Sequence, residues 1–256
     1  MDIISIKFAL FSATSIVIFH LIASKYRIGF LALLSCGFIA AFNYYLLPYV
    51  LLFALINYLI GQKIPFSKHK IALFRTGIVV NLSQLIILKY SSFTIDPFLR
   101  IFVSEASVSK LAEIMVPVGV SYFTLQGIGY LINIKMGWEN PEGSFLKFLL
   151  YITFFPKFLS GPVERSNHFI TQLDFNKGIG ERQISDGLRI ILIGVFKKVA
   201  IANQLGPYVF NSMTNTTYTD GLTSWVIFII QPLYLYFDFS GYTDSIASPC
   251  FRSRFS

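Results

Sequence analysis

The fold is decided by Val116-Pro-Val-Gly-Val-Ser-Tyr-Phe-Thr-Leu-Gln126 and by Phe154-Phe-Pro-Lys-Phe-Leu-Ser-Gly-Pro-Val-Glu-Arg165. Both stretches are apolar enough to lie in a bilayer, yet both contain Pro, Gly and hydrogen-bonding side chains. Lipid offers no partner to the backbone groups that Pro and Gly set free, so such interruptions persist only where protein or a water-filled cavity covers them. The two stretches therefore predict a membrane protein with a polar interior.

The composition also predicts a polytopic, all-α membrane protein. The 256-residue chain is 54% hydrophobic and 17% aromatic but only 13% charged, and its mean hydropathy is +0.63. Soluble domains carry about 25% charged residues. The net charge of +8 is typical of cytoplasmic loops that follow the positive-inside rule. Because the basic residues are scattered between apolar runs, no nucleic-acid partner is predicted.

The cysteines and the N-terminus do not change the predicted class of protein. Cys36 and Cys250 form neither a disulfide framework nor a metal-binding motif, so no metal site is predicted. The first apolar run follows Asp2 and Lys7 and lacks a convincing cleavage site. We therefore interpret it as a retained first span rather than a signal peptide.

The apolar runs predict about seven or eight membrane helices, each needing about 20 apolar residues, with interfacial helices between them. Spans or mixed helices are expected at 8–24, 28–60 (two spans, separated near 43–48), 77–88, 117–134, 145–159, 186–205 and 222–236. Between 28–60 and 77–88, a loop with Lys63, Lys68, Lys70 and Arg75 has no acidic residue and is expected to face the cytoplasm. The mixed segment 91–113 is expected to be an extracytoplasmic loop with a surface helix.

Several polar residues lie inside these apolar runs. Asn81 and Gln84 are expected to point inward, because amides in hydrocarbon need partners. Lys197 and Lys198 indicate a helix that lies near an interface, where lysines reach the headgroups, or one that faces a protein cavity. Asp238 should avoid lipid and find a partner; it either marks a functional path or bonds the backbone at a helix end.

Other polar positions have two interpretations each. Tyr122 and Gln126 are four residues apart and share one helical face, which lines a cavity or packs against another helix. Arg165 could bind an anionic group, or form an ion pair with the neighbouring Glu164. The histidines His20, His69 and His168 have no adjacent carboxylate or nucleophile in the sequence. These residues predict a polar interior but no reaction.

Four blocks of sequence resemble the bacterial branch of the membrane-bound O-acyltransferase (MBOAT) family, which acts in alginate O-acetylation and D-alanyl transfer. The blocks are Pro117–Gln126 with Gly129–Ile132; Phe154–Lys157 and Ser160–Arg165 with Phe169, Gln172 and Leu173; Gly187, Leu188, Ile193–Lys198, Ala202 and Asn203; and Tyr236–Asp244. They occur in the family's order and cover about residues 117–244. The N-terminal third is similar by hydropathy alone.

The resemblance implies a multi-helix fold around a tunnel in the bacterial cytoplasmic (inner) membrane. An acyl group, expected to be acetyl, would pass from a cytoplasmic thioester donor (acetyl-CoA or an acyl carrier) to a hydroxyl of an extracytoplasmic polysaccharide. A periplasmic acyltransferase partner and membrane lipid are expected, and no bound cofactor. The polar breaks and the resemblance together give the candidate residues of a tunnel or substrate path: Pro117, Tyr122, Gln126, Pro156, Gly161, Pro162, Arg165, Asp238, Ser240 and Asp244.

The chain departs from the family pattern after Asp244. In the family, the catalytic histidine follows the Tyr236–Asp244 block at some distance, so no catalytic residue is assigned here and the expected histidine would lie beyond Ser256. The tail 245–256 contains Pro249 and two arginines, which would interrupt the expected helix. We interpret residues 1–244 as the N-terminal part of a single membrane domain, expected to be inactive alone, and the tail as a possible frameshift or premature stop.

Two other classes of protein remain open. Broken helices are also typical of transporters and flippases, although the paired halves common in transporters are not found here. A non-catalytic membrane scaffold subunit would retain the helices without the chemistry.

Overall fold

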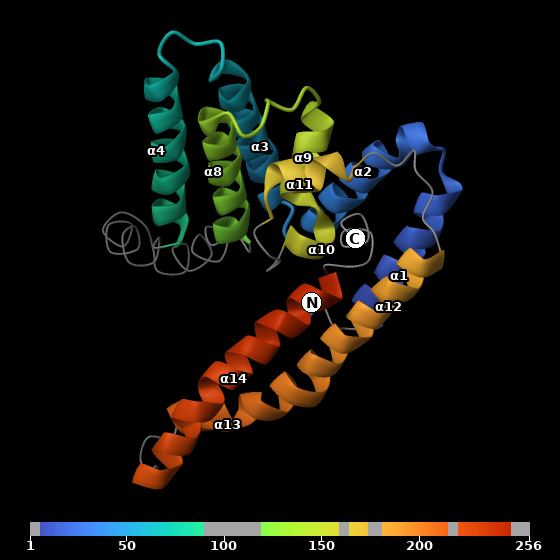
Figure 1. Ribbon diagram of the computed structural model, residues 1–256, viewed down its shortest axis with the longest axis vertical. Coiled ribbons are helices and arrows are strands. Elements are labelled where there is room, and N and C mark those ends of the chain that lie inside the picture. The colour runs from blue at the N-terminus through green and yellow to red at the C-terminus, as the bar shows by residue number, and fades with distance from the viewer. Residues whose placement is uncertain (1–5, 90–118, 159–163, 174–180, 215–219, 247–256) are drawn as a thin grey trace, which may run out of the picture. The chain divides into compact units, whose positions relative to one another are not determined.

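The computed structural model describes residues 6–89, 119–158, 164–173, 181–214 and 220–246 (Figure 1). Every regular element in these ranges is a helix, and the all-α membrane class is confirmed. The elements are α1 (Ile6–Leu21), α2 (Ser24–Phe42), α3 (Leu46–Lys63), α4 (Lys70–Lys89), α8 (Val120–Met136), α9 (Phe145–Thr153), α10 (Phe155–Phe158), α11 (Ser166–Thr171), α12 (Glu181–Phe196), the π-helix η1 (Lys197–Ala202), α13 (Asn203–Thr214) and α14 (Gly221–Ile246).

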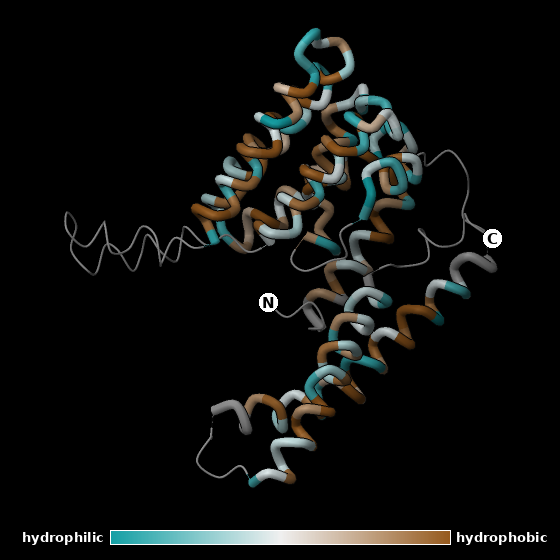
Figure 2. The backbone as a smooth tube through the Cα atoms, turned by 60° about the vertical axis from the view of Figure 1, so that its left-hand side comes forward, coloured by the Kyte–Doolittle hydropathy of each residue, from teal (hydrophilic) through white to brown (hydrophobic). Residues whose placement is uncertain are grey.

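Four of the described helices are long and apolar enough to cross a membrane: α2, α3, α4 and α14. The other expected spans fall on the shorter helices α1 and α8, on α9 with α10, and on α12 with η1 and α13. Hydrophobic residues recur along the helices, and the connection between α3 and α4 has both hydrophilic and hydrophobic residues (Figure 2). The helices form two compact units, residues 13–176 and residues 1–12 with 177–256, which are described separately.

The predicted break between the spans of 28–60 is confirmed. Helix α2 ends at Phe42, and Asn43 is extended, with φ of −157°. The Asn43 side chain then accepts a hydrogen bond from the backbone N–H of Tyr45 at 2.9 Å. Pro48 lies in the first turn of α3, where a missing backbone N–H breaks no helical hydrogen bond.

In the 13–176 unit, α3, α4 and α8 lie side by side (Figure 1). Small residues permit this: a Cβ on Gly61 would lie 2.5 Å from the Tyr130 ring, and one on Gly77 would lie 2.8 Å from Leu131. Tyr130 and Leu131 are fully buried. In lipid the hydrophobic effect does not drive helices together, so helices associate through close van der Waals packing, which glycine permits.

The inward orientation predicted for Asn81 and Gln84 is confirmed. Asn81 is buried and exchanges side-chain hydrogen bonds with Asn57 of α3, at 2.8 and 3.2 Å. Gln84 accepts a hydrogen bond from the Tyr49 hydroxyl and donates one to Thr124 of α8 at 3.1 Å. The amides therefore join three helices.

Three segment boundaries differ from the prediction. The expected span 145–159 is not continuous, because α9 has 9 residues, about 14 Å at 1.5 Å each, and ends before Phe154, which leaves helical geometry. The mixed helix expected at 186–205 is longer and includes a π-helical segment. Lys70 and Arg75 belong to α4 rather than to the loop. The predicted loop 91–113 lies outside the described residues.

In the unit that contains residues 177–256, α12 and α14 pack against each other in opposite directions (Figure 1). The contacts show the antiparallel direction. Gly194 of α12 lies next to Ser245, near the end of α14, whereas Gly206 of α13, later in the chain, lies next to Tyr234, nearer the middle of α14. A Cβ on Gly194 would lie 2.6 Å from the Ser245 nitrogen, so the two backbones are nearly in contact.

Candidate functional site

A buried lysine lies at the break between α9 and α11. The side chain of Lys157 on α10 is 4% exposed. Its ammonium nitrogen lies 3.5 Å from the centroid of the Phe169 ring and 4.9 Å from that of Tyr151. A cation over aromatic faces is attracted by their electron-rich π systems. The lysine is thus held in an aromatic enclosure rather than in lipid.

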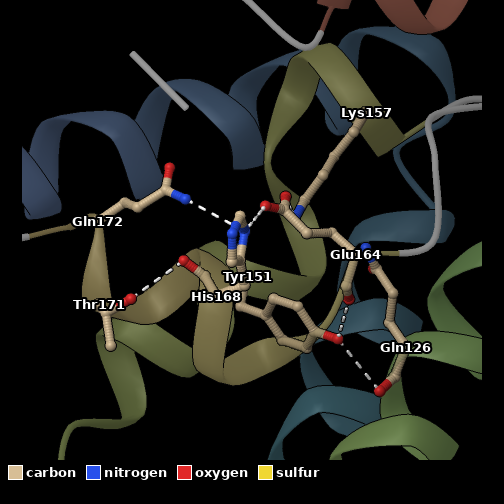
Figure 3. A network of polar contacts seen from close by, with 7 residues as sticks. All are labelled: Gln126, Tyr151, Lys157, Glu164, His168, Thr171 and Gln172. Carbon is tan, nitrogen blue, oxygen red and sulfur yellow. Dashed lines mark hydrogen bonds and ion pairs between the residues drawn. The ribbon is translucent and has the colours of Figure 1, made fainter. Parts of the chain in front are cut away.

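Glu164 connects this lysine to the rest of the cluster (Figure 3). One carboxylate oxygen, Oε2, lies 3.6 Å from Lys157 Nζ, and the other, Oε1, lies 3.0 Å from His168 Nδ1. The Tyr151 hydroxyl lies 2.9 Å from the backbone oxygen of Glu164 and 3.3 Å from that of Gln126 on α8, so it can donate to either. The cluster therefore joins α8, α9, α10 and α11.

Local sequence explains the position of His168. Helix α11 begins at Ser166, so His168 is in its first turn and Glu164 precedes it by four residues, the spacing of neighbours on one helical face. Gln172 Nε2 lies 3.2 Å from the same nitrogen, His168 Nδ1, so this nitrogen either donates to Glu164 or accepts from Gln172. The Thr171 hydroxyl, which also contacts Asn167, lies 3.1 Å from the His168 carbonyl oxygen.

The burial of Lys157 leaves few partners for its charge. Among the described residues, the Glu164 carboxylate at 3.6 Å is the acidic group paired with its ammonium nitrogen, which otherwise faces the Phe169 and Tyr151 rings. Burying a charge is costly unless it is paired, so Glu164 and the two rings keep this cation in the protein.

A second polar cluster fixes the start of α11. The Ser166 hydroxyl donates to Glu139, a residue of the loop after α8, and Asn133 Nδ2 lies 3.2 Å from the same carboxylate oxygen. Ser166 is fully buried. Burial raises the pKa of Glu139, while the hydrogen bonds from Ser166 and Asn133 oppose the rise. This cluster fastens α11 to α8 and stabilises the position of the first cluster.

The other unit contains a third charged cluster. Lys197 Nζ donates to Asp244 Oδ2 at 2.6 Å and to Ser240 Oγ at 3.0 Å, and Lys198 forms an ion pair with Asp238. Both lysine side chains are about a quarter exposed. The prediction that Asp238 finds a partner is confirmed, but the alternative that it bonds the backbone at a helix end is wrong, because α14 continues to Ile246 and the partner is a lysine. The lysines, which were expected at an interface or facing a cavity, turn toward carboxylates of α14.

The structure brings some of the predicted path residues into these clusters. Gln126 contributes its backbone oxygen to the first, and its side chain is buried; Asp238, Ser240 and Asp244 form the third. Tyr122 is half-buried on α8, and Pro156 lies within α10. Pro117, Gly161 and Pro162 lie outside the described residues. That these residues line a path stays a prediction.

Two expectations about the first cluster need correction. Arg165 is exposed, and the ion pairs of Glu164 are formed with Lys157 and His168. His168 does have a carboxylate partner, four residues before it. The spacing of Glu164 and His168 could have shown this pair in the sequence. The enclosure of Lys157 by Tyr151 could not have been found, because it depends on how α9 and α10 turn at Phe154.

Residues 142–248 match the model of the MBOAT, membrane-bound O-acyltransferase family. The resemblance inferred from the four blocks is thereby confirmed. Three relatives are similar over longer or shorter stretches. A peptidoglycan O-acetyltransferase of Helicobacter pylori is 30% identical over 243 residues, which are 84% of this chain and 46% of the relative. A probable alginate O-acetylase, AlgI, of Pseudomonas aeruginosa is 28% identical over 235 residues, which are 89% of this chain and 44% of the relative. A teichoic acid D-alanyltransferase of Bacillus subtilis is 28% identical over 129 residues, which are 49% of this chain and 32% of the relative.

The chain therefore spans less than half the length of these relatives. The family match nevertheless contains Lys157, Glu164 and His168 of the first cluster and all the residues of the third. These charged residues thus lie in the part of the chain that matches the family model.

Proposed function

Because residues 142–248 carry the sequence of the membrane-bound O-acyltransferase family, we propose that the protein containing this chain is a membrane O-acyltransferase that acts on a cell-surface polymer. The family match is the observation that carries the proposal. It is supported by relatives whose names describe acyl transfer to peptidoglycan, alginate and teichoic acid. All-α architecture with several apolar helices suits a multi-pass membrane enzyme of this kind.

The proposed reaction moves an acetyl group from a cytoplasmic thioester, acetyl-CoA or an acyl carrier, to a polysaccharide hydroxyl outside the cytoplasmic membrane. Attack of the hydroxyl oxygen on the thioester carbonyl forms the ester bond and breaks the carbon–sulfur bond. A general base must take the hydroxyl proton, and the departing sulfur must receive one. We assign no residue of this chain to that base. A periplasmic acyltransferase is the proposed partner.

The described residues have a structural part in this proposal. The Tyr151 hydroxyl and the Lys157 ammonium hold Glu164 between α9 and α11, next to the polar face of α8 that carries Tyr122 and Gln126. A substrate path through apolar helices needs polar groups that are held by protein rather than exposed to lipid. Such an arrangement supports the path proposed along α8.

The experiment that tests the proposal measures ester-linked acyl groups on the cell surface. The gene containing this chain is deleted, the surface polysaccharides are purified, and acyl groups released by mild alkali are identified. Deletion should remove one class of acyl ester, and the intact gene should restore it. Amide-linked N-acetyl groups, which resist mild alkali, are the internal control. Unchanged ester content in the deletion strain contradicts the proposal.

A transporter or flippase is the alternative that the broken helix at Phe154 favours, because discontinuous helices often form transport sites. Vesicles containing the protein would then accumulate a solute down an imposed ion or proton gradient. If deletion of the gene abolished this uptake and left the ester content unchanged, the protein would be a transporter rather than an acyltransferase. A scaffold subunit would change neither measurement directly but would destabilise a partner protein.

A further inference from the structure

Two consecutive lysines of the π-helix η1 are paired with two carboxylates of α14. Lys197 contacts Asp244 at 2.6 Å, and Lys198 contacts Asp238. The two carboxylates lie within α14, which is long and apolar enough to cross a membrane, where charges avoid lipid by pairing with each other. Because the two pairs add no net charge, their presence does not serve solubility and calls for a structural explanation.

The glycine contact between the helices lies between the two pairs. Gly241 is three residues from Asp238 and three from Asp244. A Cβ on Gly241 would lie 2.9 Å from both the Gly194 oxygen and the Lys198 nitrogen. The backbones thus touch at this point. From here the Lys197 side chain extends toward Asp244 and the Lys198 side chain extends toward Asp238. A one-turn shift would bring a residue with a Cβ, Phe237 or Ser245, to the place of Gly241, so the glycine contact already disfavours sliding, and the charge pairs on either side of it add a second constraint.

The spacing of the carboxylates forbids such sliding. Asp238 and Asp244 are the only acidic residues of α14, and they are six residues apart, whereas one helical turn is about 3.6 residues. A shift by one turn toward lower numbers would bring Tyr234 to Lys198 and Ser240 to Lys197. A shift the other way would bring Tyr242 to Lys198. Every one-turn shift removes both carboxylates from both lysines.

We propose that the two lysine–aspartate pairs fix the alignment of α14 against α12 and η1, so that these helices enter the membrane as an electrically neutral antiparallel pair with a single register. Specifying register is the best-supported role of buried polar and ionic groups in helix pairs. The inference does not depend on which reaction the protein performs.

Crosslinking tests the register directly. In membranes carrying the whole gene product, Cys36 and Cys250 are replaced by serine, and Gly206→Cys is combined with Tyr234→Cys to report the native alignment. The matched reporter, Gly206→Cys with Ile230→Cys, reports a shift of one turn, about 5.4 Å. A short thiol-specific bifunctional reagent should give an excess of the native over the shifted crosslink on the order of tenfold.

The decisive variant replaces all four charges by apolar residues: Lys197→Met, Lys198→Met, Asp238→Leu and Asp244→Leu. It leaves no unpaired charge, so the protein should accumulate in membranes, but the crosslink ratio should fall severalfold because only the glycine contact then holds the alignment. Retention of the native ratio by this variant overturns the proposal. Exchange of charges, Lys198→Asp with Asp238→Lys, should keep the ratio native, whereas Asp238→Asn alone should lower it or prevent accumulation. Arg189→Gln, an exposed change on α12, is the control and should leave the ratio unchanged.

Discussion

At the scale of single residues, Lys157 is the most unusual group in the described structure. It is buried among aromatic rings, and one carboxylate, that of Glu164, lies 3.6 Å away. Removing this carboxylate would leave a buried ammonium without its counter-charge, which is strongly destabilising.

We expect Glu164→Gln to lower the unfolding free energy by about 3–5 kcal/mol, the cost of leaving a buried charge without its partner. Thermal unfolding in detergent measures this loss. Adding Lys157→Met to Glu164→Gln should recover part of it, because no unpaired charge remains, whereas adding Lys63→Met, an exposed change at the end of α3, should not. Equal losses with the two second changes would contradict the role of the Lys157–Glu164 pair.

Tyr151 supports the same cluster through its hydroxyl, which lies within hydrogen-bond distance of the carbonyl oxygens of Gln126 and Glu164. Tyr151→Phe keeps the ring over the lysine but removes the donor. We expect a loss of about 1–3 kcal/mol in unfolding free energy, because a buried acceptor is left without its donor. Tyr26→Phe, at an exposed position of α2, should cost much less. Equal losses in the two variants would mean that the hydroxyl has no special role.

At the scale of elements, the mutual hydrogen bonds of Asn57 and Asn81 hold α3 against α4. Replacing one asparagine by leucine leaves the other amide buried without this partner, which should cost about 1–3 kcal/mol. Replacing both should cost less than the sum of the two single changes, because no orphaned amide remains. Unfolding of the two single variants and the double variant, with Ser83→Ala on the exposed face of α4 as control, measures the coupling. Additive losses would contradict it.

Helix positions in this protein follow from local chemistry where Pro, Gly and hydropathy act together. The break at Asn43 and the inward amides of α4 were predictable, because lipid leaves few alternatives for polar groups. The break at Phe154, inside the expected span 145–159, was missed, since Pro156 can stand in the first turn of a new helix as well as end an old one. The π-helix at Lys197 could not be predicted, because six residues are too few for its period to differ visibly from that of an α-helix.

The candidate site was predictable to a different degree in its two parts. The family blocks named Asp238 and Asp244, and their need for partners followed from the apolar sequence around them. Which cations they would meet depended on how α12 and α14 align, which no local pattern specifies. For the same reason the role of Tyr151 was missed: it lies in an apolar run, and its contact with Glu164 joins residues on different helices.

At the scale of the whole molecule, contacts within the 13–176 unit determine which connections share one end of the helices. The Tyr58 hydroxyl of α3 donates to the Gly143 carbonyl at 3.0 Å, and Gln62 donates to the carbonyl of Glu142. The loop between α8 and α9 therefore lies at the same end as the loop between α3 and α4 (Figure 1). The turn at Tyr44 between α2 and α3 lies at the opposite end, because α3 separates it from Lys63.

This arrangement makes the orientation in the membrane testable with three cysteines. The α3–α4 connection is bordered by Lys63, Lys68 and Lys70, and the positive-inside rule places it in the cytoplasm. In a protein without its native cysteines, Ser67→Cys and Gly143→Cys should react with an impermeant maleimide only after the membrane is opened. Tyr44→Cys should react in intact cells whose outer barriers admit the reagent. If Ser67→Cys and Gly143→Cys are labelled from opposite sides, α3 and the α8–α9 loop cannot be arranged as described. If both react in intact cells while Tyr44→Cys does not, the packing is correct and the assigned orientation is inverted.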